Sequence, residues 1–309
     1  MRFQIGYHLF FAALFATHLQ GAIYGHDDRK ELSTFAPNSI ERKVARAIAL
    51  IIPKKRLVPI SPSLYRIDFK TLAQEHVAVE EPLCPWEPFQ DQTASIFSAS
   101  TGFLVGQDRM VTAGHVIENK TKCSGAAIVF GYHNDKLVKP EIVRAQDVYY
   151  CQDIVETFLE DAPLKDHAVF LLDRPVPNRQ PLPIRREGKI SDNSTTEMIG
   201  HPMGLPIKVT GNGIMANNLS HTYFVSYLDT YGGNSGSPVF DPFTGVVEGV
   251  LVEGEAGDTT IKGNWPEGCW HSKVHCPKAL PMPSRCDTYD YRGAKVIRAT
   301  DFAHAVPIP

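Results

Sequence analysis

The sequence predicts an all-β fold, either a sandwich or a barrel, from about residue 94 onward. Short apolar runs recur there, separated by turn residues such as Gly211-Asn212-Gly213 and the segment 241–245. No helical pattern alternates with these runs, which argues against a parallel α/β sheet. The segments that we expect to form strands are 96–105, 142–150, 168–172, 197–199, 207–209, 223–227 and 246–252.

Composition limits the kind of partner. The chain has 309 residues, of which 43% are hydrophobic, enough for two small domains or one large β domain. Its 31 Lys and Arg residues nearly balance 34 Asp and Glu residues, so the net charge is -3. Because no large electrostatic field results, we expect neither a nucleic acid nor an anionic membrane as partner.

Residues 1–22 have the pattern of an export signal. Arg2 precedes a mostly apolar stretch over 5–19, which His8 and His18 interrupt and which is too short to span a membrane. We expect cleavage after Ala22 and a secreted mature protein without a membrane anchor. A buried N-terminal helix is the alternative.

Six cysteines favour disulfide bonds in an exported chain, although the sequence does not say which residues pair. A zinc cluster is the alternative for Cys269, His271, His275 and Cys276, but the paired Cys-x-x-Cys spacing is missing. We therefore expect disulfides and no metal site. The six residues are Cys84, Cys123, Cys151, Cys269, Cys276 and Cys286.

The region between the signal and the β-rich part lacks the recurring short apolar runs, separated by turns, that predict strands elsewhere. Apolar residues at helical spacing predict a short helix over 41–52, which Pro53 closes. Residues 53–92 carry six prolines and no clear period. We therefore expect residues 23–92 to form an N-terminal arm or a pro-segment.

Three segments hold residues suited to chemistry. In the first, Thr112-Ala113-Gly114-His115, a histidine follows the end of an apolar strand. The second opens a strongly apolar strand with Asp166, where a buried carboxylate needs a donor such as an imidazole N–H. Taken alone, each has an ordinary alternative: His115 as a surface or core residue, and Asp166 as an exposed strand cap with Asp161 as a rival acid.

The third segment, Gly232-Gly233-Asn234-Ser235-Gly236-Ser237, is the most specific. A nucleophilic serine must be exposed on a tight turn whose backbone N–H groups converge where an oxyanion develops, and glycines permit that geometry. A glycine-rich hairpin loop would explain the glycines. It would not explain why this block of small residues leads directly into an apolar strand.

His115 in Thr-Ala-Gly-His, Asp166 in Asp-x-Ala-Val and Ser235 in Gly-Asn-Ser-Gly-Ser-Pro resemble the three motifs of the chymotrypsin-like serine peptidases, in that family's order. The form Gly-Gly-Asn-Ser-Gly-Ser-Pro-Val is most similar to bacterial glutamyl endopeptidases and related secreted trypsin-like peptidases. The resemblance extends from about residue 98 to about residue 253. It implies two antiparallel β-barrels with the active site between them.

The domain organisation follows from this resemblance. We expect the first barrel over 93–175 and the second over 176–262, with the proline-rich interval 175–183 as the linker. The tail 263–309, which contains cysteines, would pack on the barrels. We expect a monomer that acts on a protein or peptide substrate.

The resemblance also implies a mechanism for a serine endopeptidase. Ser235 would be the nucleophile, His115 the base, and Asp166 the residue that orients the imidazole. The backbone N–H groups of Gly233 and Ser235 would form the oxyanion hole. No metal or organic cofactor is required.

Residues near the nucleophile are expected to set the substrate preference. Asp229 matches the acid at the bottom of a trypsin-type pocket, which favours Arg or Lys at the cleaved position; alternatively, it hydrogen-bonds the loop backbone and never meets substrate. Thr230 resembles the glutamyl specialists, but Leu251 stands where they have a histidine. We therefore place a basic preference above a glutamyl one. The expected substrate-binding residues are Asp229, Thr230, Leu251, Val252 and Gly254.

Two other functions compete with this interpretation. An α/β-hydrolase esterase would have Gly-x-Ser-x-Gly, whereas Ser237 stands at the last glycine, and its acid and histidine would follow the serine. An inactive homologue that binds a partner would not need all three motif residues. In addition, Asn234 replaces the aspartate of the digestive branch, which argues against activation through an ion pair with a new N-terminus.

Overall fold

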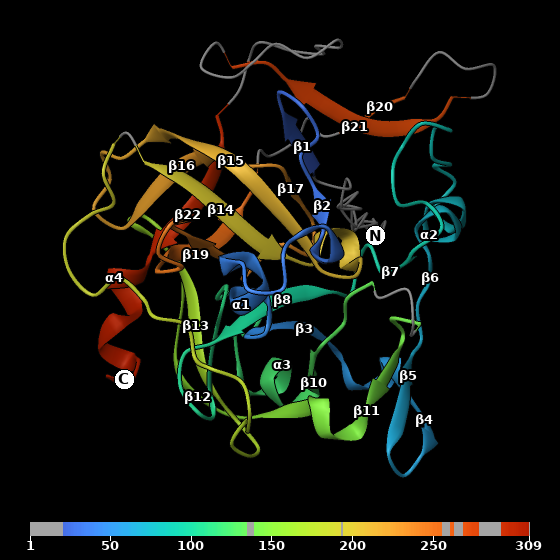
Figure 1. The fold of residues 1–309 in the computed structure, drawn as a ribbon, viewed down its shortest axis with the longest axis horizontal. Coiled ribbons are helices and arrows are strands. Elements are labelled where there is room, and N and C mark those ends of the chain that lie inside the picture. The colour runs from blue at the N-terminus through green and yellow to red at the C-terminus, as the bar shows by residue number, and fades with distance from the viewer. Residues whose placement is uncertain are drawn as a thin grey trace, which may run out of the picture.

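The computed structural model describes residues 21–134, 139–192, 194–254, 260–262, 268–277 and 292–308. These residues form a mostly-β fold of two six-stranded antiparallel barrels, which confirms the predicted fold class (Figure 1). The largest cluster of buried apolar side chains draws on both barrels, with Phe103 and Phe170 from the first and Phe240 and Ile297 from the second. The two barrels are therefore packed together through a shared core.

The first barrel closes in the strand order β10-β12-β13-β9-β8-β3. Its strands are β3 (Ile48–Pro53), β8 (Ser100–Leu104), β9 (Arg109–Thr112), β10 (Ala126–Phe130), β12 (Val148–Asp161) and β13 (Leu164–Leu172). The interiors of these strands are rich in Val, Ile, Leu and Phe, which favour a pleated and half-buried surface.

The helix predicted over 41–52 is wrong for its second half, because residues 48–53 form strand β3. The helix α1 covers only Ile40–Ala45, where the Ser39 side chain accepts a hydrogen bond from the Arg42 backbone N–H as an N-cap. Residues 48–52 are buried on both faces of a strand between β8 and β10, so their apolar residues need no helical period. The β-branched Ile48, Ile51 and Ile52 also favour this extended conformation.

The second barrel follows the order β14-β18-β19-β22-β16-β15 and closes through the pairing of β14 with β15. The two-residue strand β2 (Lys30–Glu31) adds to the outer side of β15. The barrel strands are β14 (Thr195–Gly200), β15 (Lys208–Asn217), β16 (Tyr223–Tyr227), β18 (Pro238–Phe240), β19 (Val247–Glu253) and β22 (Ala294–Arg298).

The predicted domain boundaries were therefore wrong at both ends. Strand β3 lies inside the expected arm 23–92, and without it the first barrel would be open. Strand β22 lies inside the expected tail 263–309, yet it pairs with both β19 and β16. A barrel closes through contacts between residues that are distant in sequence, which local patterns do not reveal.

The beginning of the described chain is also an integral strand. β1 (Gly21–Tyr24) is antiparallel to β17 (Thr230–Tyr231) and parallel to β21 (Trp270–His275), which in turn pairs with β20 (Thr260–Lys262). Figure 1 shows β1 beside β21, above the second barrel. Ala22, the predicted cleavage position, is fully buried in β1, whereas residues 1–20 of the predicted signal lie outside the described residues.

Two disulfide bonds connect described cysteines. Cys84 is bonded to Cys269, and Cys123 in α3 (Lys120–Gly125) is bonded to Cys151 in β12. The expected disulfides are thus present for these four cysteines, and the sulfur of Cys269 is not available to bind zinc as a thiolate. Within the described ranges, no helix is long and apolar enough to cross a membrane.

Short elements connect the barrels and cover their surfaces. Helix α4 (Ala299–Phe302) follows β22 directly and leads to the C-terminal end of the chain (Figure 1). The remaining elements are β4 (Leu57–Ser61), β5 (Leu64–Ile67), β6 (Lys70–Thr71), α2 (Leu72–Ala78), β7 (Thr93–Ala94) and β11 (Ile142–Arg144), with 3-10 turns at Leu32–Thr34, Lys54–Arg56, Ala145–Asp147, Pro202–Gly204 and Ala303–Ala305.

Candidate active site

His115 and Asp166 are joined by two hydrogen bonds. The imidazole Nδ1 lies 2.8 Å from Asp166 Oδ2, and the His115 backbone N–H donates to Asp166 Oδ1 at 2.9 Å. Both contacts arise from the first barrel, because β9 ends just before His115 and pairs with β13, which carries Asp166. The carboxylate is largely buried, at 11% side-chain exposure, while the imidazole is 39% exposed. One ring nitrogen is therefore fixed and the other faces outward.

Gly114 makes this arrangement sterically possible. A Cβ atom at this position would lie 1.9 Å from the carbonyl oxygen of Phe158 and 3.0 Å from Asp166 Oδ1. Strand β12 therefore passes directly against the backbone that presents His115. Only glycine allows this approach without displacing the strand or the carboxylate.

Ser235 stands on a turn that is hydrogen-bonded to both barrels. In the first barrel, Thr101 on β8 donates from its backbone N–H to the Ser235 carbonyl at 2.9 Å, and from its hydroxyl to the Gly233 carbonyl at 2.8 Å. In the second barrel, the Gly236 backbone N–H donates to the Leu251 carbonyl on β19 at 2.7 Å. The turn is thus held where the two barrels meet. Thr101 was not among the sequence-predicted site residues.

The backbone N–H groups of Gly233 and Ser235 are left available for an acceptor. Within the described residues neither one donates a backbone hydrogen bond, whereas the N–H of Asn234 donates to the Tyr231 carbonyl. The Gly232 carbonyl accepts from Met203, and in a planar trans peptide the following N–H points the opposite way. Gly233 adopts φ +95°, and a Cβ there would lie 2.4 Å from the His201 carbonyl. Glycine is therefore required at this position.

A cavity of about 180 Å³ lies beside Ser235, and His115 borders it too. No hydrogen bond joins these two side chains in the described structure, but they face the same space. Of the predicted substrate-binding residues, Thr230, Leu251, Val252 and Gly254 line this cavity. Three further lining residues, Tyr231, Gly232 and Glu253, were not among the predicted substrate-binding residues.

Asp229 is placed differently from the other predicted residues. Its carboxylate is 2% exposed and does not border the cavity. It accepts hydrogen bonds from the backbone N–H groups of Tyr24, at 2.7 Å, and Asp28, at 3.0 Å. Burial, reinforced by the charges of Asp28 and Asp27, raises the pKa of Asp229 well above its usual range. The structure therefore gives Asp229 a role in anchoring the N-terminal strand and no contact with the cavity.

Glu253 is the acidic residue that lines the cavity. Its Oε2 lies 2.7 Å from the Lys295 ammonium on the neighbouring strand β22, and the two side chains are each about one-third exposed. Lys295 itself does not line the cavity. The sequence signal for Glu253 was its position between the predicted residues Val252 and Gly254, at the end of an apolar strand.

A second cavity, of about 340 Å³, borders His115 from the side of the first barrel. Its lining includes the exposed Phe97, Ser98 on the approach to β8, and Lys122 on α3. His115 thus stands between two hollows, and an extended chain that passes the imidazole has space on both sides. Among the described residues, no group of three or more His, Cys, Asp or Glu side chains could hold a metal ion.

Comparison with known proteins agrees with this fold. Residues 100–250 match the family model described as the trypsin-like peptidase domain. This span is just under half of the chain, and over it the sequence is similar to trypsin-like peptidases; the two six-stranded barrels form the chymotrypsin-like fold. The matched span begins in β8 and ends in β19, so the strands β3 and β22 that complete the two barrels lie outside it. No curated protein matches the chain in sequence.

Solved structures with similar folds include proteases from several organisms. The active form of a protease from M. tuberculosis has 14% identity and a TM-score of 0.46, over 93% of this chain and 91% of that chain. A serine endoprotease from Yersinia pestis has 14% identity and a TM-score of 0.44, over 72% of this chain and 58% of that chain. A scabies mite inactivated protease paralogue has 11% identity and a TM-score of 0.48, over 87% of this chain and 95% of that chain.

Proposed function

We propose that this chain is a secreted serine endopeptidase that cleaves peptide bonds through Ser235, His115 and Asp166. The observation that carries the proposal is the pair of hydrogen bonds between His115 and Asp166, next to a cavity that His115 shares with Ser235. The two disulfides fit an oxidising compartment. The match of residues 100–250 to the trypsin-like peptidase domain supports the reaction class.

The proposed mechanism uses side chains and backbone groups of this chain and one water molecule. His115 Nε2 takes the proton from Ser235 Oγ as the oxygen attacks the scissile carbonyl, and Asp166 holds the imidazole in the required tautomer. The N–H groups of Gly233 and Ser235 stabilise the oxyanion. His115 then protonates the leaving amine, which departs as the acyl-enzyme forms. A water molecule, deprotonated by the same imidazole, hydrolyses the acyl-enzyme and releases Ser235.

The two cavities beside His115 favour an endopeptidase over an esterase. A peptide must continue on both sides of its scissile bond, and the hollows of about 180 Å³ and about 340 Å³ meet at the imidazole. A small ester would need only the first of these spaces.

We propose a preference for Arg or Lys at the cleaved position, carried by Glu253 in place of Asp229. Among the described residues that line the smaller cavity, Glu253 is the only carboxylic acid. The Tyr231 hydroxyl, whose pKa burial raises well above its usual range, donates to Ser272. A carboxylate attracts a basic substrate side chain and repels a glutamate. The glutamyl preference is therefore the less favoured alternative.

A peptide-library digest with the purified mature protein tests activity and preference together. We expect internal peptide bonds to be cut, mostly after Arg and Lys, and we expect no cleavage by Ser235→Ala protein made in parallel. Cleavage mostly after Glu would overturn the proposed preference while leaving the endopeptidase intact. A folded protein that cuts no peptide would overturn the function itself and favour an inactive homologue.

A further inference from the structure

A cavity of about 710 Å³ on the outside of the first barrel is lined by several positively charged side chains. It lies between α1, the end of β10 and β11, and shares no residue with the two cavities beside His115. Five cationic side chains border it against one carboxylate, a formal excess of four positive charges in a chain whose net charge is -3. We call these cations the basic groove: Arg42, Arg46, Lys139, Arg144 and Arg179.

Most of these guanidinium groups are held in place by uncharged partners. Arg42 Nε donates to the Phe35 carbonyl at 3.2 Å, and Arg46 Nη2 donates to the Asn178 carbonyl at 3.0 Å. Arg179 Nη1 donates to the Arg46 carbonyl at 2.7 Å. A carbonyl fixes the orientation of a guanidinium without cancelling its charge, and the remaining N–H groups of the fork stay available to an anion.

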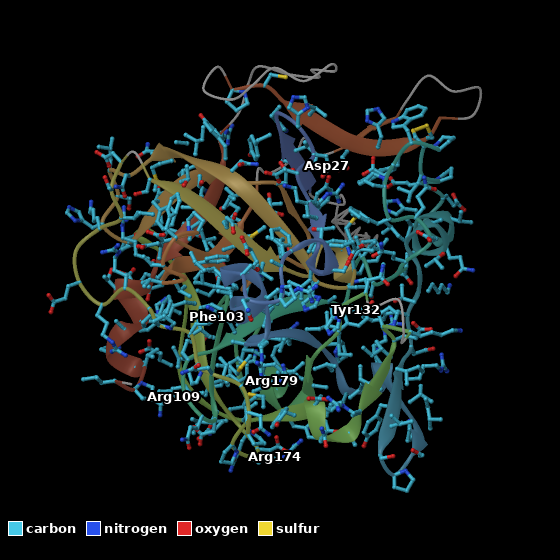
Figure 2. The ribbon with its side chains drawn as sticks, viewed as in Figure 1. Asp27, Phe103, Arg109, Tyr132, Arg174 and Arg179 are labelled. Carbon is cyan, nitrogen blue, oxygen red and sulfur yellow. A yellow bond between two sulfur atoms is a disulfide. The ribbon has the colours of Figure 1, made fainter. Side chains whose placement is uncertain are left out.

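The one carboxylate in the groove, Asp147, is already shared by two arginines. Its Oδ2 accepts from Arg144 Nε at 2.9 Å and its Oδ1 accepts from Arg179 Nη2 at 2.9 Å. Arg179 is also stacked over the Phe130 ring, 4.8 Å from its centroid. Figure 2 labels Arg179 in the half of the molecule formed by the first barrel. Asp147 therefore orders the two arginines and leaves a local excess of positive charge.

The groove is elongated. A neighbouring hollow of about 750 Å³ shares Arg46 and Arg179 with it and adds the exposed Lys43 and a rim formed by the segment 175–181. A small anion would occupy only a fraction of this length. The lining also includes the largely buried apolar residues Leu32, Phe130 and Val143. These features fit an extended chain that carries both acidic and apolar side chains.

We propose that the basic groove binds an acidic peptide segment in extended form. Carboxylates of the segment would pair with the guanidinium forks of Arg42, Arg46 and Arg144 in bidentate geometry. Its intervening apolar side chains would contact the apolar lining. The groove is separate from the proposed catalytic residues, so this binding does not depend on peptidase activity.

The test measures peptide binding to full-length mature protein carrying Ser235→Ala, so that no cleavage removes the ligand. The probe is a fluorescein-labelled peptide of alternating Glu and Leu, followed by fluorescence anisotropy. We expect saturable binding that weakens at least about ten-fold between about 50 mM and about 300 mM salt, because salt screens exposed ion pairs. The same peptide with Gln in place of Glu should bind at least about ten-fold more weakly.

A matched pair of double variants locates the binding. Lys43→Glu with Arg46→Glu, the groove variant, reverses one exposed charge of the groove and one of the hollow that continues it, and Lys55→Glu with Lys70→Glu reverses two exposed lysines outside both. Both change the net charge equally. We expect at least about a ten-fold loss of affinity for the groove variant alone, with the thermal midpoints of both variants close to that of the parent.

Three results would overturn the proposal. Equal loss of affinity in the two double variants would mean that overall charge attracts the peptide. Equal binding of the Gln peptide would mean that the apolar lining acts without the arginines. Tighter binding of a labelled duplex oligonucleotide than of the acidic peptide, lost in the groove variant, would mean that the groove is built for nucleic acid.

Discussion

The carboxylate of Asp229 accepts a 2.7 Å hydrogen bond from the backbone N–H of Tyr24, 205 residues earlier in the chain. The same carboxylate accepts from the Asp28 backbone, and the strand that contains Tyr24 pairs with Thr230–Tyr231, a wall of the cavity beside Ser235. The first described residues thus brace the proposed substrate pocket. The buried Asp229, six residues before Ser235 in the sequence, therefore holds this N-terminal strand in place.

The brace should weaken as the pH rises. Burial raises the pKa of Asp28 to about 6, and burial also raises the pKa of Asp229. A carboxyl whose folded pKa is raised stabilises the fold below its unfolded pKa of about 3.9, and this contribution is lost as the pH rises through the folded pKa. In urea titrations, the stability of the parent relative to Asp28→Asn should therefore fall between about pH 4 and about pH 6. A difference that is constant or rises with pH would contradict this assignment.

Replacing Asp166 by asparagine should impair the base without unfolding the protein. The new amide would present an N–H to His115 Nδ1, which favours the wrong imidazole tautomer, and turnover should fall by about 10⁴-fold. The matched control is Asp161→Asn, which changes the exposed rival acid on the neighbouring strand. Turnover of a peptide substrate by the two variants decides the matter. An equal loss of turnover in both variants would contradict the proposal that Asp166 orients His115.

Gly114→Ala should destabilise the fold because the added methyl group collides with the Phe158 carbonyl oxygen, which lies 1.9 Å from the position that a Cβ atom would take. We expect a loss of about 3 kcal/mol in the free energy of unfolding, as for an overpacked core site. Gly125→Ala in α3 is the control, since nothing lies within 4 Å of its Cβ position. That change should leave stability unaltered or raise it slightly. Similar unfolding midpoints for the two variants would show that β12 can move away from Gly114.

Glu253 and Lys295 should have opposite effects on substrate preference. Glu253→Gln removes the carboxylate at the cavity, so the ratio of kcat/KM for Arg over Leu at the cleaved position should fall roughly ten-fold. Lys295→Met frees the carboxylate from its ion pair and should raise that ratio. Glu187→Gln, an exposed site outside this cavity, is the control. An unchanged ratio in both variants would exclude Glu253 as the specificity residue.

The sequence predicted those parts of the molecule that depend on neighbours in the chain. Gly114 and Gly233 lie within two positions of His115 and Ser235, so the motifs around these proposed catalytic residues could be identified locally. In the sequence, only the apolar run that follows Asp166 favoured this residue over the exposed Asp161 as the acid that orients the imidazole. The resemblance in motif order then gave the two barrels.

What the sequence could not predict depends on long-range contacts. The apolar run over Ile48–Pro53 fits a helix as well as a strand, and only its partners β8 and β10 decide between them. The hydrogen bond from Tyr24 to Asp229 spans most of the chain, so the acid looked equally suited to substrate binding. Glu253 was missed because the bulge near the end of β19 sets its direction.

Labelling with a fluorophosphonate tests the central proposal most directly. The reagent forms a covalent bond with a serine only when a neighbouring base and oxyanion donors activate that oxygen. We predict one adduct on the folded, mature protein, mapped by mass spectrometry to Ser235 and absent from Ser235→Ala and His115→Ala. Folded protein that takes up no label, or that is still labelled after Ser235→Ala, would contradict the assignment of Ser235 as the nucleophile.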